Sequence, residues 1–126
     1  GVFIARVTLL DRKGRCLSVN DYIIDGNGKK DFTPLNALPN VTLKAECRKR
    51  GEDVVYKISN TDRAVAIGIK LNLEDGVTGQ QILPAVFSDG YFNLYPGESR
   101  EITVKYSYSK SVKLSAEGYN VNSEIK

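Results

Sequence analysis

The side chains of this sequence that could do chemistry are mainly carboxylates. The 126-residue chain contains no histidine, which excludes Ser-His-Asp and Cys-His arrangements. Most carboxylates fall at expected turns or on the polar faces of expected strands, but Asp89 lies two residues before an aromatic pair, Tyr91-Phe92. Its side chain can accept hydrogen bonds from turn amides, the usual role of Asp before Gly, or reach toward a site on a neighbouring domain. We favour the structural role.

Four aromatic residues offer a second kind of chemistry, the stacking of sugar rings. They are Tyr91, Phe92, Tyr95 and Tyr119. The chain has no Trp, the best stacking residue. A strand would direct the adjacent Tyr91 and Phe92 to opposite faces and so place one of them in a core. We therefore expect core or interdomain packing, and keep a carbohydrate-binding surface as the alternative.

The sequence predicts no metal site and no cofactor. Cys16 and Cys47 fit no metal-ligand spacing. The segment 25–31 lacks the glycine and the glutamate that a calcium loop needs at fixed offsets. Gly-rich phosphate loops are also missing. We expect two free thiols that behave as small buried apolar side chains, although a disulfide between them stays open because its geometry requires a structure.

Charge and hydropathy give no sign of a nucleic-acid or membrane partner. The formal net charge is +3, and the one basic cluster is Lys44, Arg48, Lys49 and Arg50. This cluster ends an expected strand and runs into Gly51, as a solvated hairpin end would, whereas phosphate-binding proteins show a broader basic stripe. No apolar run approaches the roughly 20 residues that span a bilayer.

Period-two alternation of apolar residues dominates the second two thirds of the chain. Its clearest example is the set of alternating apolar residues Val65, Ile67, Ile69, Leu71 and Leu73. Similar patterns begin near Val41, Val54, Ile102 and Val112, with Gly-, Asn- and Asp-containing turns between them. No window has an amphipathic helical pattern of useful length. Short strands separated by regular turns predict an all-β sandwich over residues 40–126.

Residues 1–24 predict a separate hairpin, joined to the sandwich by a linker over residues 25–39. The first strand alternates Phe3, Ala5, Val7 and Leu9 on one face, and we expect Leu17 and Val19 to face the same way from the partner strand. An isolated two-stranded hairpin is marginal in water, and its bare edge invites pairing. We therefore expect residues 1–24 either to fray or to form a homodimer.

Two stretches carry a specific resemblance. Residues 83–99 read LPAVFSDGYFNLYPGES, and residues 6–22 read RVTLLDRKGRCLSVNDY. The first is similar to the C-terminal immunoglobulin-like domain of glycoside hydrolase family 2 enzymes, especially exo-β-glucosaminidases and β-mannosidases. The second resembles the closing hairpin of the preceding immunoglobulin-like domain. Gly90 and Tyr119 depart from the Asn and Trp common in these families, which loosens the assignment to one substrate subclass.

The resemblance implies an accessory role. In the resembled enzymes the catalytic carboxylates lie in an upstream barrel, so the chain would be a non-catalytic, bracing piece of a longer β-glycosidase acting on β-mannosides, β-glucosaminides or β-galactosides. Its partners would be the upstream domains, with the saccharide bound through the parent enzyme in the periplasm or outside the cell. The alternatives are a carbohydrate-binding module with a Tyr/Phe platform and a fibronectin-like adhesion module, which share the same fold signals.

Overall fold

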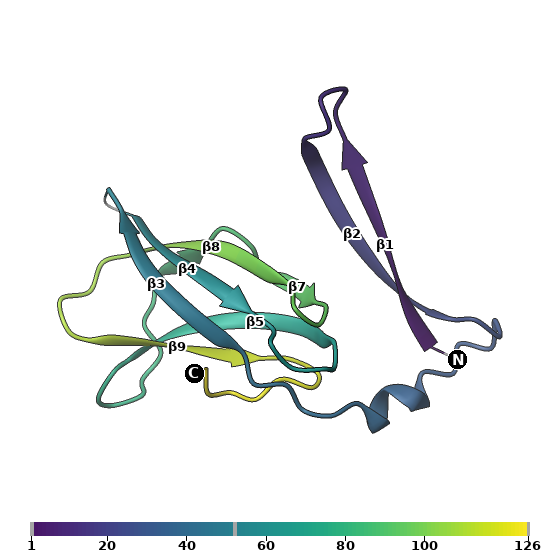
Figure 1. Ribbon diagram of the computed structural model, residues 1–126. Coiled ribbons are helices and arrows are strands. Elements are labelled where there is room, and N and C mark those ends of the chain that lie inside the picture. Colours follow the sequence, from purple (N-terminus) through teal and green to yellow (C-terminus); the bar gives the residue numbers. More distant parts are fainter. Residues whose placement is uncertain (1, 52, 126) are drawn as a thin grey trace. The chain divides into compact units, whose positions relative to one another are not determined.

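A computed structural model describes residues 2–51 and 53–125 of the chain. The described residues form strands, turns and one short 3-10 helix, η1 (Thr33–Ala37), so the predicted all-β class is confirmed. The chain divides into two compact units, residues 1–38 and residues 39–126 (Figure 1).

The first unit is an antiparallel hairpin of β1 (Val2–Leu10) and β2 (Cys16–Asp25). Asp11 shapes its turn, because the carboxylate accepts hydrogen bonds from the amides of Lys13 and Arg15 at 2.9 and 2.8 Å. These bonds lower the pKa of Asp11, with the Arg15 amide making the largest contribution. A local Asx-type turn therefore sets the hairpin reversal.

The pairing register corrects the expected composition of the hairpin's apolar face. Residues paired directly across two antiparallel strands share a face. Val7 pairs with Asn20, whereas Val19 pairs with Thr8 and so lies on the opposite face. A register shift at Leu9/Leu10 displaces the partner strand near the turn, an irregularity that alternation along one strand does not encode.

One face of the hairpin is mainly apolar at the end away from the turn. Phe3 pairs with Ile24 and Ala5 with Tyr22 on this face. Phe3 and Tyr22 are 52% and 55% exposed, so these large side chains are not buried by the described residues. The other face holds an ion pair in which Arg6 donates two hydrogen bonds to Asp21, at 2.8 and 3.1 Å.

The second unit is a sandwich of two antiparallel sheets (Figure 1). The four-stranded sheet has the order β3-β4-β8-β6, with bounds β3 (Lys44–Arg50), β4 (Asp53–Ser59), β8 (Ser99–Tyr106) and β6 (Ala85–Phe87). The three-stranded sheet has the order β7-β5-β9, with bounds β7 (Tyr91–Leu94), β5 (Ala66–Asp75) and β9 (Val112–Glu117). From β4 onward, each successive strand belongs to the other sheet, so every connection crosses the sandwich.

The core lies between these sheets. The four-stranded sheet contributes Ile58 and Ile102, both fully buried, and the three-stranded sheet contributes Ile69 and Leu73 at 0% and 1% exposure. The alternation predicted along β5 is confirmed from Ile69 onward. Earlier in the strand Ala66 is also fully buried, because the register with β7 shifts between Ala66 and Ile69, around a glycine with positive φ.

Two buried asparagines join the ends of the sandwich. Asn60, at the end of β4, donates from Nδ2 to the carbonyls of Ala64 and Leu94 at 2.8 and 3.0 Å. Asn120, after β9, donates to the carbonyls of Pro39 and Val65 at 3.0 and 2.7 Å.

Asn120 also accepts a hydrogen bond from the amide of Ile67 at 3.0 Å. One side chain thus satisfies three backbone groups that no strand ladder reaches.

Replacing Asn120 by Ala should leave these three backbone groups without a hydrogen-bond partner. An unsatisfied buried group costs about 1–3 kcal/mol, so we expect the unfolding free energy to fall by about 3 kcal/mol, which corresponds to the low end of that range for each group. Asn122→Ala is the matched control, because Asn122 is exposed and its amide reaches only the Thr42 hydroxyl among side chains. Urea unfolding followed by circular dichroism measures both. Equal midpoints for the two variants would contradict a linking role for Asn120.

Candidate functional site

The chain passes from one sheet to the other at residues 88–90, and we call this segment the strand switch. It determines where the predicted site residues Asp89, Tyr91 and Phe92 lie. β6 ends at Phe87 in one sheet, and β7 begins at Tyr91 in the other. Ser88 extends the pairing with β8, because its amide donates to the Thr103 carbonyl and its hydroxyl accepts from the Thr103 amide, both at 2.9 Å. Gly90, without a side chain, then completes the crossing, so the segment around Asp89 links the two sheets.

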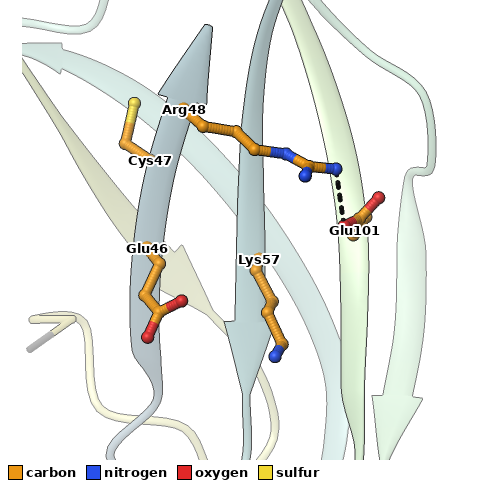
Figure 2. Close-up of a pocket in the computed structure, with 5 residues that line it drawn as sticks. All are labelled: Glu46, Cys47, Arg48, Lys57 and Glu101. Atoms are coloured by element: carbon orange, nitrogen blue, oxygen red, sulfur yellow. Dashed lines mark hydrogen bonds and ion pairs between the residues drawn. The ribbon is translucent and has the colours of Figure 1, made fainter. Parts of the chain in front are cut away.

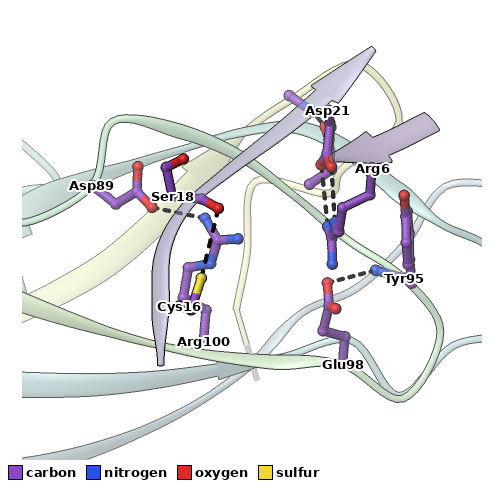
Figure 3. Close-up of polar contacts among 10 residues, drawn as sticks. Arg6, Cys16, Ser18, Asp21, Asp89, Tyr95, Glu98 and Arg100 are labelled. Carbon is purple, nitrogen blue, oxygen red and sulfur yellow. Dashed lines mark hydrogen bonds and ion pairs between the residues drawn. The ribbon is translucent and has the colours of Figure 1, made fainter. Parts of the chain in front are cut away.

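Asp89 has a structural partner, but not the one expected. Its carboxylate accepts a hydrogen bond from the guanidinium of Arg100 on β8, Nη1 to Oδ2 at 2.7 Å (Figure 3). Within the described chain, the expected contacts with turn amides are replaced by this ion pair. The same guanidinium lies over the Phe92 ring, 4.9 Å from its centroid. Asp89 therefore holds the cation that covers an edge of the core.

The aromatic residues of the site divide as the strand geometry predicts. Phe92 is 5% exposed and belongs to the core cluster, whereas the adjacent Tyr91 is 71% exposed on the outer face of its sheet. Lys70 lies over the Tyr91 ring at 6.0 Å from the centroid. Tyr95 is half-buried in the turn at Pro96-Gly97, where its amide donates to the Glu98 carboxylate at 3.3 Å (Figure 3). These aromatics do not form one continuous platform.

A second candidate is a shallow pocket of about 320 Å³ on the outer face of the four-stranded sheet (Figure 2). Its two carboxylates, Glu46 and Glu101, lie on β3 and β8, with Lys57 of β4 between them. Glu101 accepts a hydrogen bond from Arg48 at 2.7 Å, and the two side chains are 50% and 56% exposed. Water therefore reaches this pair freely, and the pocket lacks the apolar enclosure that gives a catalytic acid a raised pKa.

Two carboxylates are buried among residues 2–51 and 53–125, Asp25 and Asp75, and both are held in their ionised form. Asp25 accepts hydrogen bonds from the amides of Asn27 and Asp31, at 3.0 and 3.1 Å, which lower its pKa. Asp75 accepts from the Tyr108 hydroxyl first of all, and from the amides of Val77 and Thr78 at 2.8 Å. These donors hold the pKa of Asp75 well below its ordinary value. Both carboxylates organise turns.

The cysteines are free thiols, but the expectation that they are buried is wrong. Cys16 and Cys47 are both exposed. Cys16 lies at the start of β2, next to the hairpin turn. Cys47 lies on β3, the edge strand of its sheet, which no further strand covers in the described part of the chain.

Within residues 2–51 and 53–125, no group of three or more His, Cys, Asp or Glu residues is placed so that it could hold a metal ion. The same described residues contain no helix with the length and apolar character needed to cross a membrane.

The sequence did not predict three residues whose side chains link distant parts of the sandwich. These are Arg100 and the buried Asn60 and Asn120, which have partners distant in the chain. A local signal existed for Asn60, since Asn60-Thr61-Asp62 was expected to be a turn and the Asp62 amide does donate to its side chain at 3.0 Å. Single-sequence patterns held no comparable signal for Arg100.

Comparisons with known proteins agree on one family. The family described as exo-β-D-glucosaminidase Ig-fold domain matches residues 21–121. An exo-β-D-glucosaminidase of the fungus Arthroderma benhamiae is 29% identical over an alignment of 142 residues, which covers 98% of this chain and 16% of that protein.

Solved structures show the same fold. The exo-chitosanase CsxA of Amycolatopsis orientalis superposes with a TM-score of 0.74 at 18% identity, covering 98% of this chain and 18% of that one. A variant of CsxA in complex with PNP-β-D-glucosamine gives a TM-score of 0.73 at 18% identity. The chain thus spans less than a fifth of the length of these relatives, and its predicted immunoglobulin-like sandwich is confirmed.

The partial exposure of the Asp89–Arg100 pair makes a prediction about stability, since the two side chains are 40% and 26% exposed. Ion pairs that water reaches contribute about 0–1 kcal/mol, so Asp89→Ala should lower the unfolding free energy by about 1 kcal/mol or less. Phe92→Ala should cost about 3–5 kcal/mol, the range for removing a buried aromatic ring. Denaturant midpoints of the two variants measure the contrast. A loss of several kcal/mol in Asp89→Ala would instead mean that the carboxylate serves buried donors.

The depressed pKa of Asp75 makes a prediction about acid stability. A carboxyl group with a lowered folded-state pKa adds stability above its unfolded pKa of about 3.9, and this stability is lost as the pH falls through the folded-state value. Tyr108→Phe removes the largest cause of the shift. The variant should be less stable than the wild type at pH 6, and the gap should narrow toward pH 2.

Tyr91→Phe is the control for the acid experiment, because it removes a hydroxyl from an exposed ring. Its stability curve should run parallel to that of the wild type over the same pH range. Parallel curves for Tyr108→Phe as well would show that the Tyr108–Asp75 hydrogen bond does not set the titration.

Proposed function

Because this chain belongs to the family of exo-β-D-glucosaminidase Ig-fold domains, we propose that it is a non-catalytic accessory domain of a glycoside hydrolase family 2 β-glycosidase. The observation that carries the proposal is the family match over residues 21–121, which extends through both sheets of the sandwich. The chain would then act on saccharides only as part of a longer enzyme.

The chemistry of its carboxylates supports a non-catalytic role. Glycoside hydrolysis uses two carboxyl groups about 5–9.5 Å apart, one of them an acid whose pKa is raised. In this chain the buried carboxylates of Asp25 and Asp75 have lowered pKa values and accept hydrogen bonds within turns. The carboxylates of Asp89 and Glu101 form ion pairs with arginines at the protein surface.

For the substrate of the longer enzyme we propose a β-D-glucosaminide, such as an end of chitosan. The curated relative is an exo-β-D-glucosaminidase, and the structural relative is an exo-chitosanase. The sequence left three substrate classes open, and we propose β-glucosaminides rather than β-mannosides or β-galactosides. Because chitosan is a polymer, we also propose that the enzyme acts in the periplasm or outside the cell.

The accessory role we propose is to brace the upstream domains of the enzyme. In that arrangement the saccharide would be held mainly by those domains. The fibronectin-like adhesion reading rests on fold alone, and no residue of this chain favours it.

A carbohydrate-binding module is the second candidate, because one observation favours it. Tyr91 is 71% exposed on the outer face of its sheet, where a ring can stack on a pyranose. The platform would be smaller than expected, since Phe92 lies in the core and Tyr95 is half-buried. Retention of the chain on immobilised chitosan, lost in Tyr91→Ala, would favour this candidate over the accessory role.

Hydrolysis assays test the accessory proposal. The purified 126-residue chain should not cleave aryl β-glucosaminides, β-mannosides or β-galactosides above background, because Asp25, Asp75, Asp89 and Glu101 are engaged in turns and ion pairs. The full-length protein that contains it should cleave the β-glucosaminide. Turnover by the chain alone, abolished in Asp89→Ala or Glu98→Ala, would overturn the proposal.

A further inference from the structure

The edge of the four-stranded sheet opens onto an apolar groove. A cavity of about 380 Å³ lies where the edge strand β3 faces β9 of the other sheet. Its walls are mainly apolar and include Ala45, Val54, Leu114 and Ile125. The groove exists because the inward-facing residues of β3 are too small or too polar to fill the space between the sheets.

β3 pairs on one side only. It lies at the end of the strand order β3-β4-β8-β6, so the backbone groups on its other side meet no strand in the described part of the chain. Alternate residues Ala45, Cys47 and Lys49 line the groove, while Glu46 and Arg48 point to the outer face (Figure 2). An added strand would find both unpaired main-chain groups and a cavity for its inward side chains.

The charge of β3 selects the kind of strand that fits. Its seven residues carry four basic side chains and one acidic side chain. Arg48 and Arg50 share Glu101, whereas Lys44 and Lys49 form no ion pair with the described residues. A second copy of this chain would bring basic side chains opposite basic side chains, which is destabilising. Acidic side chains on an added strand would pair with them.

Basic side chains on an edge strand also discourage non-specific pairing, and charge alone would carry no inference. The groove is the independent feature. In a closed sandwich, apolar side chains of the edge strand would fill this volume, whereas here Tyr56 and the exposed thiol of Cys47 border it.

We propose that β3 and the groove form a docking surface for an extended peptide segment of another protein. In this segment, apolar residues alternate with acidic residues. The segment adds as a strand beside β3, its apolar side chains enter the groove, and its carboxylates lie along the basic edge. The surface is separate from the strand switch at Asp89, and the inference does not depend on the activity of any longer enzyme.

The two cysteines provide the test. Cys47 lies at the sheet edge, where it borders both the groove and the outer-face pocket, and Cys16 lies in the other unit. Both thiols are exposed. The probe is a seven-residue peptide of alternating Glu and Val, capped at both ends. At ten times its dissociation constant, the free fraction of the chain falls to about one eleventh, so alkylation of Cys47 should slow about tenfold. Alkylation of Cys16 should keep its rate.

Control peptides separate the two components of recognition. A peptide with Ser in place of Val keeps the charge but has nothing to enter the groove, and one with Lys in place of Glu is repelled. Neither should protect Cys47. In the chain, Lys44 alternates with Glu46 and Arg48 on the outer face of β3, beside which the carboxylates of the added strand would lie. Lys44→Glu should therefore abolish protection by the Glu-Val peptide, while Lys29→Glu, the same charge change in the other unit, should not.

Hydrogen exchange supplies a readout of main-chain pairing. With the Glu-Val peptide bound, amides of β3 that do not bond to β4 should become protected. Equal protection of Cys47 by the Ser peptide would overturn the proposal in favour of a purely ionic contact. Protection by decanoate but not by the Glu-Val peptide would overturn it in favour of a small amphipathic anion. Absence of any protection at millimolar peptide would also overturn it.

Discussion

Each sheet of the sandwich can bury only one face, and it does so against the other sheet. From β4 onward every connection therefore crosses from one sheet to the other, which removes the backbone from ladder pairing at each crossing. Backbone groups at these crossings need other hydrogen-bond partners, and polar side chains supply them. Asn60 and Asn120 serve carbonyls at the ends of the sandwich, and Asp75 serves amides in the turn after β5. Burying the apolar core between two sheets thus depends on these polar side chains, which bond to the backbone where the chain leaves a sheet.

The same requirement explains what the carboxylates of this chain do. A carboxylate that accepts several amide hydrogen bonds is held ionised, and its pKa falls, as at Asp25 and Asp75. A catalytic acid needs the opposite environment, in which burial without donors raises the pKa. The acidic groups that lie deepest in this chain are therefore used for folding. This use agrees with the accessory role that we propose for this member of the family of exo-β-D-glucosaminidase Ig-fold domains.

Sequence reasoning succeeded where the signal is local and periodic. Alternation predicted the buried face of β5, and adjacency predicted that Tyr91 and Phe92 would face opposite ways. It failed where the answer depends on a distant partner. The guanidinium that meets Asp89 comes from Arg100 on another strand, and the face on which Val19 lies depends on a register shift in the hairpin. The exposure of Cys47 follows from its place on an edge strand, which strand order decides and alternation does not.

Two surfaces remain after the core is formed, and they differ in chemistry. The hairpin face of Phe3, Val7 and Tyr22 is apolar and exposed, and nothing on it selects one partner over another. The edge at β3 combines an apolar groove with fixed positive charge, and charge adds selectivity because it penalises wrong partners as well as rewarding the right one. An apolar surface alone binds many apolar partners, whereas an apolar surface bordered by charged side chains favours partners with complementary charge. For that reason the edge at β3, rather than the hairpin face, supports an inference about a specific partner.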